Sequence, residues 1–595
     1  MANKSNRGGC LRQFFITLLV LVLLLAGIVI GASLFFSSMG SKPKITSNTY
    51  LTWNIKMLPE YKETQMFQLS KPLSMDVVKA VLESARDDDR VLGLVIDFSN
   101  QAIPGSSIEE IREMIIDFKS KGKKIYAYAD NYVLGNYRLA SLADRIFMAD
   151  TDNCNVSFIG YAVYQPYMKD MLDKLGIKMQ VLHQGEYKGA GENLSRTDMS
   201  DAVEEDYKRL FGSIFDIRVS DIAENRNLDK SEFERDILSG KYAVMTAREA
   251  LEAGFVDELC YYRNIKNTIN DGKKLNMVSI SSYTPKFKKA EKKIAVVYAD
   301  GEIRTGSSGN NFSPWGGFTK VLGSDTVVKQ FTDILEDDSI KGVVFRVDSP
   351  GGSALASQLM YDAIKEVNAK KPVIVSMSSV AASGGYYISM ASRKIVVQPS
   401  TITGSIGVVS VIPDMSEAFK KLGINMSGFH VGKYSDFGST DRALNDEEKE
   451  LFDRILGNIY TEFKTRVSEN RGIPMDELEE YARGRVYTGL QAIEVGLADE
   501  VGGIPKAIEL LKAELGMSAD EEVFTVQYPK EKTFFEMLSE GDFMSSIMGR
   551  KSWAGGLEPY GTLAEGIATW IERAFYYNRA NNPLMLYTEY IPEEI

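Results

Sequence analysis

Mainly apolar runs alternate with charged segments of helical period along most of this chain. Residues 91–98 and 342–347 are short apolar runs, whereas residues 107–119 place apolar side chains at helical spacing among charged ones. Apolar strands that lie between helices are typical of the buried strands of an α/β sheet. Residues 447–469 predict a long amphipathic helix whose apolar face carries Leu451, Ile455, Ile459 and Phe463. The pattern therefore predicts the α/β class.

Residues 14–36 contain no charged side chain. A helix of this length would cross the ~30 Å hydrocarbon layer of a bilayer, so we expect a membrane anchor. Lys4, Arg7 and Arg12 precede the run, and the positive-inside rule then places residues 1–13 in the cytoplasm and the remainder outside. A cleaved signal peptide is the alternative, but its apolar segment is shorter than this run, and no A-x-A cleavage site follows.

An internal repeat organises the chain after the apolar run. Residues 87–95 (DDDRVLGLV) resemble residues 336–344 (EDDSIKGVV) at an offset of 249. Further matches keep the same order: Tyr137 with Tyr386, Arg145 with Lys394, Glu224 with Glu469, Thr246 with Thr488, and Asp257 with Asp499. Two long copies predict a duplicated domain instead of a solenoid of short repeats. We expect a first half at residues 50–285, a second half at 293–530, and a tail at 531–595 outside the repeat.

Composition narrows the function. The formal charge of −12 and the pI near 5.1 argue against a nucleic-acid partner. The three cysteines, Cys10, Cys154 and Cys260, show no CxxC spacing, so no metal site is indicated. No glycine-rich phosphate loop follows a strand, so nucleotide chemistry is not supported.

Ser383 is the candidate nucleophile. It follows the apolar run of residues 373–375 and precedes Gly384, Gly385 and a segment that could continue as a helix. A serine at such a strand-to-helix turn lies beside unpaired backbone N–H groups, which favour a developing negative charge. The alternative is that Ser383 only caps the helix.

A catalytic histidine is not favoured by the repeat. The chain has two histidines, His183 and His430, and they occupy matching positions in the two halves. We expect a structural role for both, because two half-domains rarely need the same base twice.

The differences between the copies point instead to Lys188. The first half has Lys188 where the second half has Ser435, and the second half has Ser383 where the first half has Leu134. Each half therefore carries one member of a possible Ser/Lys pair. Lysine works as a general base only when neutral, which requires a pKa lowered by burial. The alternative is an ordinary surface lysine.

Four motifs in this order carry a family resemblance: residues 185–188 (GEYK), 348–353 (DSPGGS), 382–387 (ASGGYY) and 403–407 (TGSIG). Together with the duplication and the single anchor, they resemble signal peptide peptidase A in its long, duplicated form, over about residues 14–530. The resemblance implies two tandem domains with the crotonase/caseinolytic-protease-like fold.

The resemblance also implies roles for site residues. Ser383 resembles the nucleophile and Lys188 the general base, Gly352 and Gly384 would supply the oxyanion-hole amides, and Ser405 resembles the serine that orients the lysine. After the lysine this chain has Gly189-Ala190 where many relatives have Ser-Ala.

The implied function is a membrane-anchored serine endopeptidase that degrades cleaved signal peptides in or near the bacterial cytoplasmic membrane, on its outer side. The implied partners are these peptides and other apolar peptides, lipid around residues 14–36, and further copies of the chain in a homo-oligomer, expected to be a tetramer. No metal or organic cofactor is implied. Two alternatives stay open at this point: a crotonase-like acyl-CoA enzyme and a non-catalytic membrane scaffold.

Overall fold

The computed structural model describes residues 45–55, 60–61, 73–99, 105–270, 272, 274–286, 290–313 and 317–530. The expected anchor at residues 14–36 and the tail at 531–595 lie outside these described residues. In the described part of the chain, no helix has both the length and the apolar character needed to cross a bilayer.

A parallel six-stranded sheet organises the first half. Its strand order is β10-β1-β2-β3-β5-β9, and every neighbouring pair is parallel. The strands are β1 (Thr49–Asn54), β2 (Val91–Asp97), β3 (Lys124–Ala129), β5 (Arg145–Met148), β9 (Glu258–Leu259) and β10 (Asn276–Ser279). The middle strands are buried almost throughout, as expected for a sheet covered on both faces.

The second half repeats this sheet. Its strands run β22-β11-β15-β16-β17-β21, which matches β10-β1-β2-β3-β5-β9 strand for strand, with β18 and then β20 added beside β16. The strands are β11 (Lys292–Asp300), β15 (Ile340–Ser349), β16 (Val373–Ala382), β17 (Lys394–Val397), β18 (Ile402–Gly404), β20 (Val486–Thr488), β21 (Glu500–Val501) and β22 (Val523–Tyr528). The predicted α/β class and repeated organisation are confirmed, whereas the exact limits of the two halves stay a prediction.

The helices repeat as well. The pair α2 (Met75–Arg86) and α3 (Gly105–Lys119) matches α11 (Ser324–Glu336) and α12 (Ala354–Lys370), and both matches begin 249 residues apart. In the same way α4 (Leu134–Ala140) corresponds to α13 (Gly384–Ser389), α7 (Asp201–Arg226) to α15 (Asp446–Arg471), and α9 (Ala247–Glu252) to α17 (Gly489–Glu494). Each half has its own large apolar core around its sheet.

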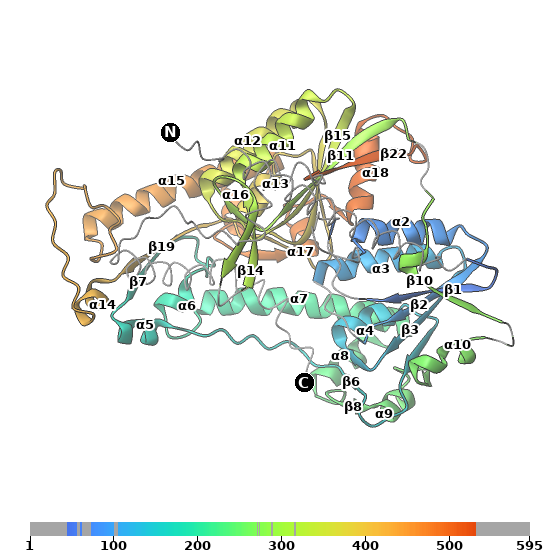
Figure 1. Cartoon of the computed structure of the whole chain (residues 1–595). Helices are drawn as coiled ribbons and strands as arrows, with labels where there is room; N and C mark the ends of the chain where they lie inside the picture. Colours follow the sequence, from blue (N-terminus) through green and yellow to red (C-terminus); the bar gives the residue numbers. More distant parts are fainter. Residues whose placement is uncertain are drawn as a thin grey trace, which may run out of the picture.

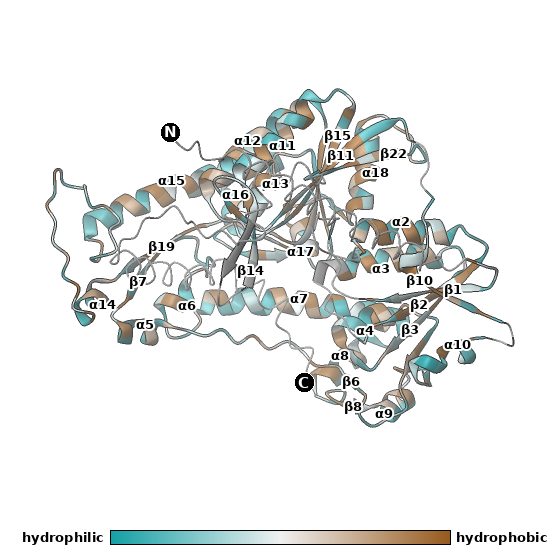
Figure 2. Ribbon diagram, in the orientation of Figure 1, coloured by the Kyte–Doolittle hydropathy of each residue, from teal (hydrophilic) through white to brown (hydrophobic). Residues whose placement is uncertain are grey.

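Helix α15 corrects one expectation. Its buried apolar residues are Leu456, Tyr460, Phe463 and Val467, so of the predicted face only Phe463 is fully buried. Ile455 is 42% exposed, and Ile459 lines the large groove described below. The apolar pattern marked a face that is shared between the core and a cavity, so spacing alone misplaced the core side. Figure 2 shows hydrophobic and hydrophilic residues alternating along α7 and α15.

Two elements join the halves. The first is an antiparallel ribbon of β7 (Lys178–Gln184) from the first half and β19 (Val408–Asp414) from the second, with Gln184 opposite Val408. The second is α7, which runs beneath both halves (Figure 1). Its residues Leu210 and Phe211 pack in one apolar cluster with Ala382 and Ile402 of the second half. The ribbon and α7 therefore hold segments that are far apart in sequence side by side.

The remaining elements are short. They are β4 (Asn131–Val133), β6 (Asn155–Ser157) and β8 (Met245–Thr246) in one small sheet, β12 (Glu302–Arg304), β13 (Gly309–Ser313) and β14 (Gly317–Gly323) in another, the 3₁₀ turns Tyr262–Asn264 and Ile280–Ser282, and helices α5 (Lys169–Leu175), α6 (Glu192–Ser195), α8 (Lys230–Leu238), α10 (Ile265–Thr268), α14 (Ser416–Lys421), α16 (Met475–Tyr481) and α18 (Ile504–Glu514).

Candidate active site

Ser383 occupies a strained turn between β16 and α13. Its φ of 53° and ψ of −118° are unusual for a residue other than glycine. The backbone is held there because the Ser383 N–H donates to the Gly404 carbonyl at 2.9 Å and the Ser383 carbonyl accepts from the Tyr387 N–H at 2.9 Å. The Ser383 side chain makes no capping hydrogen bond to α13, so the alternative of a simple helix cap is wrong.

Lys188 reaches this serine from the other half of the chain. It follows β7, and its Nζ lies 3.0 Å from Ser383 Oγ, within hydrogen-bond reach. The side chain is buried, with 8% of the residue exposed, and among the described residues no carboxylate forms an ion pair with it. Burial without a counter-charge lowers the pKa of Lys188 from 10.5 to about 7. The alternative of a surface lysine is therefore wrong.

Ser405 holds the lysine from the opposite side. Lys188 Nζ donates to the Ser405 carbonyl at 2.9 Å and to Ser405 Oγ at 2.8 Å. Ser405 has a φ of 53°, and its own N–H donates to the Arg485 carbonyl at 2.7 Å. The lysine amine is therefore fixed between Ser383 and Ser405.

Gly352 and Gly384 present backbone amides at the same place. A parallel bridge between Ile303 and Gly352 uses the N–H groups of Ile303 and Ser353 and leaves the Gly352 N–H unused. Gly384 begins α13, where N–H groups have no partner within the helix. A Cβ placed on Gly384 would lie 3.3 Å from the Gly352 nitrogen, so the two glycines are neighbours. Among the described residues, neither amide donates a hydrogen bond, and both are available to an oxyanion.

These residues line a groove of about 1130 Å³. The groove contains Lys188, Ser383 and Ser405, and much of its remaining wall is apolar, with Tyr207, Leu355, Val409, Val411, Met415, Leu456, Ile459 and Phe463. Its walls come from both halves of the chain. A peptide with apolar side chains would fit the chemistry of this wall.

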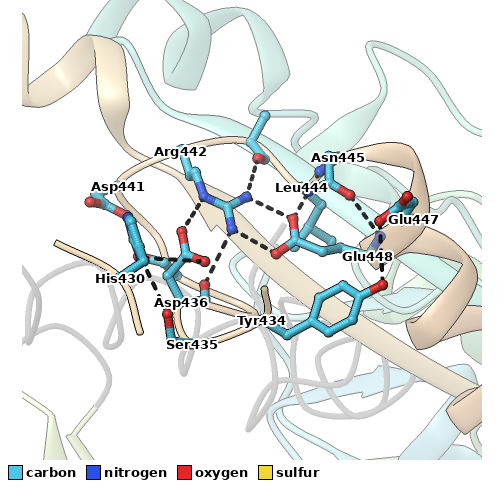
Figure 3. A network of polar contacts seen from close by, with 12 residues as sticks. His430, Tyr434, Ser435, Asp436, Asp441, Arg442, Leu444, Asn445, Glu447 and Glu448 are labelled. Carbon is cyan, nitrogen blue, oxygen red and sulfur yellow. Dashed lines mark hydrogen bonds and ion pairs between the residues drawn. The ribbon is translucent and has the colours of Figure 1, made fainter. Parts of the chain in front are cut away.

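The two histidines lie away from the groove lining. His183 is exposed, its Nδ1 lies 3.0 Å from the Gly185 carbonyl oxygen, and it lines a smaller cavity of about 260 Å³ that shares Lys188 with the groove. His430 belongs to a polar surface cluster around Arg442, in which its Nδ1 lies 3.4 Å from Ser435 Oγ (Figure 3). Neither ring reaches Ser383 in place of Lys188.

Sequence reasoning missed Tyr187 and Arg485. The Arg485 guanidinium lies over the Tyr187 ring, with its carbon 3.7 Å from the ring centroid. The signal that could have found Arg485 is the repeat itself. When the two halves are aligned through Thr246 and Thr488, Arg485 corresponds to Ala243 in the first half.

A serine on a strained turn, beside a buried amine and two free backbone amides, is the arrangement of a serine hydrolase. Comparison with protein families gives the same class. The profile of peptidase family S49 matches residues 117–276 and 365–518, more than half of the chain. The chain therefore belongs to peptidase family S49, with two tandem regions of that family, and is a serine protease. The Clp protease profile also matches residues 320–402, in agreement with the predicted fold relationship.

Individual relatives cover most of the chain. It is 31% identical over 511 residues to the chloroplastic serine protease SPPA of Arabidopsis thaliana, across 84% of this chain and 73% of that protein. It is 30% identical over 478 residues to protease 4 of Haemophilus influenzae (76% and 75%), and 31% identical over 460 residues to protease 4 of Salmonella typhi (73% and 72%). The relatives favour a protease over the acyl-CoA enzyme and the scaffold.

Proposed function

We propose that this chain is a membrane-anchored serine endopeptidase that uses Ser383 as nucleophile and Lys188 as general base to degrade cleaved signal peptides. The observation that carries the proposal is the 3.0 Å distance between Lys188 Nζ and Ser383 Oγ at a buried lysine. A neutral amine at this distance can take the hydroxyl proton as the oxygen attacks a scissile carbonyl.

The remaining steps follow from the neighbours of the pair. As the Ser383 oxygen attacks, the carbonyl oxygen gains negative charge, and the amides of Gly352 and Gly384 would donate to it. Protonated Lys188 then gives its proton to the leaving amine, and an acyl-enzyme remains on Ser383. Water attacks this ester with Lys188 again acting as base. Ser405 orients the amine in both half-reactions, through its hydroxyl and its carbonyl.

The substrate class rests on the groove and the anchor. Signal-peptide remnants are apolar and stay in or near the membrane, and the groove wall is largely apolar. Residues 14–36 would hold the enzyme at the cytoplasmic membrane, with its catalytic part on the outer side. We further propose a homo-oligomer, expected to be a tetramer, in which each chain contains a complete Ser/Lys pair.

The proposal can be tested on the full chain in detergent or membranes. A fluorophosphonate probe should label the wild-type protein and fail to label Ser383→Ala. Hydrolysis of an apolar fluorogenic peptide should be lost in Ser383→Ala and in Lys188→Met, and the double variant should be no worse than either, because both changes disable one step. Labelled Ser383→Ala, or a folded Lys188→Met with normal turnover, would contradict the proposal. An acyl-CoA substrate should give no turnover in any variant.

A further inference from the structure

Arg485 contacts Tyr187, the residue before Lys188, and Ser405, which holds the lysine amine. It lies just before β20, and its carbonyl accepts the Ser405 N–H at 2.7 Å. Its guanidinium covers the ring of Tyr187, the residue before Lys188, and donates a hydrogen bond to the Tyr187 hydroxyl. One residue of the second half therefore contacts both the loop that carries the lysine and the serine that orients it.

The guanidinium itself is held in place. It donates to Glu205 of α7 at 3.2 Å, and the Arg485 side chain is 18% exposed. Stacking on an aromatic ring combined with directed hydrogen bonds uses the planar geometry of arginine, which a lysine does not reproduce. The contact therefore restricts where the Tyr187 ring can lie.

The backbone next to Arg485 packs directly against Lys188. The Arg483 carbonyl accepts the Tyr187 N–H at 2.8 Å. Gly484 has a φ of 84°, and a Cβ there would lie 2.6 Å from the Lys188 nitrogen. Only a glycine permits this approach, so the segment 483–485 packs directly against the lysine loop.

The first half of the chain has no arginine at the position that matches Arg485. The position that corresponds to Arg485 in the first half is Ala243. The Ala243 carbonyl accepts a hydrogen bond from the Ser157 hydroxyl at 2.7 Å. Among the described residues, Ala243 has no contact with a lysine loop of the other half. Arginine is thus present in the copy that receives Lys188 and absent from the copy that does not.

We propose that Arg485 is a positioning residue whose guanidinium holds Tyr187, next to the backbone contact of its carbonyl with Ser405, and so keeps the Lys188 amine buried against Ser383. The inference rests on the proposed Ser/Lys function. Arg485 acts through the lysine and does not touch the reacting atoms. Without the guanidinium, the lysine loop would move, Lys188 would gain water, and its amine would be both misplaced and more readily protonated.

Other charged groups close to this loop are already paired. Glu186 of the lysine loop pairs with Arg483 at 3.3 Å, and on α7 Asp206 pairs with Arg209 at 2.6 Å. The Asp206 carboxylate also accepts the Val486 N–H at 3.0 Å. Burial raises the pKa of Asp206, and the charges of Arg209 and Arg485 both oppose that rise. Replacing Arg485 therefore affects Asp206 as well as Glu205, which loses its ion-pair partner.

The test compares Arg485→Ala, Arg485→Lys and Tyr187→Phe with the control Arg393→Ala, which removes a surface arginine paired with Glu514. In full-length protein, Arg485→Ala should lower kcat by ~10- to 100-fold with KM changed less than ~3-fold, as expected for a misplaced catalytic group. The midpoint of its pH–rate profile should move to higher pH. Arg485→Lys should restore little, and Tyr187→Phe, which keeps the ring but loses the hydroxyl, should shift both quantities in the same direction by less.

Two outcomes would overturn the inference. The first is a folded Arg485→Ala with the kcat and pH midpoint of Arg393→Ala. The second is a loss of kcat with an unmoved pH midpoint and a lowered melting temperature, which would indicate a merely structural arginine. Ser383→Ala and Lys188→Met are assayed beside them. If those two are inactive while Arg485→Ala behaves as wild type, only the positioning role fails; if they are active, the Ser/Lys function itself fails.

Discussion

Replacing Lys188 by methionine should abolish activity and yet stabilise the folded protein at neutral pH. Methionine has a similar length and no charge, so it can fill the buried site without taking up a proton. The lysine, in contrast, is protonated in the unfolded chain at pH 7 and must lose that proton to stay neutral in the fold. Function and stability should therefore change in opposite directions at this one position.

The magnitude follows from the pKa of Lys188, which burial lowers from 10.5 to about 7. At ~1.4 kcal/mol per pKa unit, this difference costs the folded protein about 4–5 kcal/mol at pH 7. Methionine removes that cost but also removes the hydrogen bonds between the amine and the Ser405 carbonyl and two hydroxyls, a loss of about 1–3 kcal/mol. A net stabilisation of about 2 kcal/mol is expected at pH 7.

The lowered pKa of Lys188 also fixes the direction in which stability changes with pH. The unfolded state binds more protons than the folded state between pH 7 and 10.5, so the wild-type protein gains stability from this group as the pH rises through that window. Near pH 10 the cost of the lysine falls to about 1 kcal/mol, and the advantage of methionine should disappear.

The assay is denaturant unfolding at pH 7 and pH 10, followed by intrinsic fluorescence, for wild type, Lys188→Met and the surface control Lys208→Met, whose side chain is 75% exposed. At a given pH, the difference in the free energy of unfolding between two variants does not contain the contributions of titrating groups that the variants share. The reasoning would be refuted if Lys188→Met were less stable than wild type at pH 7, or if the difference between the two proteins were the same at both pH values.

Three further predictions concern activity. Peptide hydrolysis by wild type should rise with pH and be half-maximal near pH 7, because the fraction of neutral Lys188 follows its lowered pKa of about 7; a rate that falls as the pH rises from 6 to 8 would exclude a neutral lysine base. Ser435→Ala and His430→Ala, at the positions that match Lys188 and His183, should keep turnover within ~2-fold of wild type in steady-state assays, since both lie outside the groove lining; loss of activity in either folded variant would contradict the split between the halves. Gly352→Ala should lower kcat by ~10²-fold or more, because its Cβ would lie 2.1 Å from the Ile303 carbonyl oxygen and displace the amide; circular dichroism checks folding, and near-normal kcat would exclude this amide from the oxyanion hole.

Much of the fold could be predicted because the repeat is regular. The offset of 249 found between residues 87–95 and 336–344 is also the offset between α2 and α11 and between α3 and α12. The differences between the two copies also point to Lys188 and Ser383 from the sequence alone. Local chemistry, a glycine-rich turn after an apolar strand, was enough to suggest the serine.

The contacts between the halves could not be predicted in the same way. The pairing of β7 with β19 joins residues more than 220 positions apart, and both strands are only half-buried along most of their length. Half-buried strands carry weak alternation, so neither partner nor register is visible in the pattern.

The ribbon explains how two copies of one domain can share a single active site. Its register places Gln184 opposite Val408, so the chain that continues from β7 to Lys188 runs alongside the segment that contains Ser405. Ser405 in turn lies next to Gly404, whose carbonyl holds the Ser383 N–H. A shift of the ribbon by one residue would turn its side chains to the opposite face and move the lysine by about 3 Å. In the proposed Ser/Lys mechanism the active site therefore requires the two halves to be docked in one register, and a chain whose halves had folded separately would be inactive.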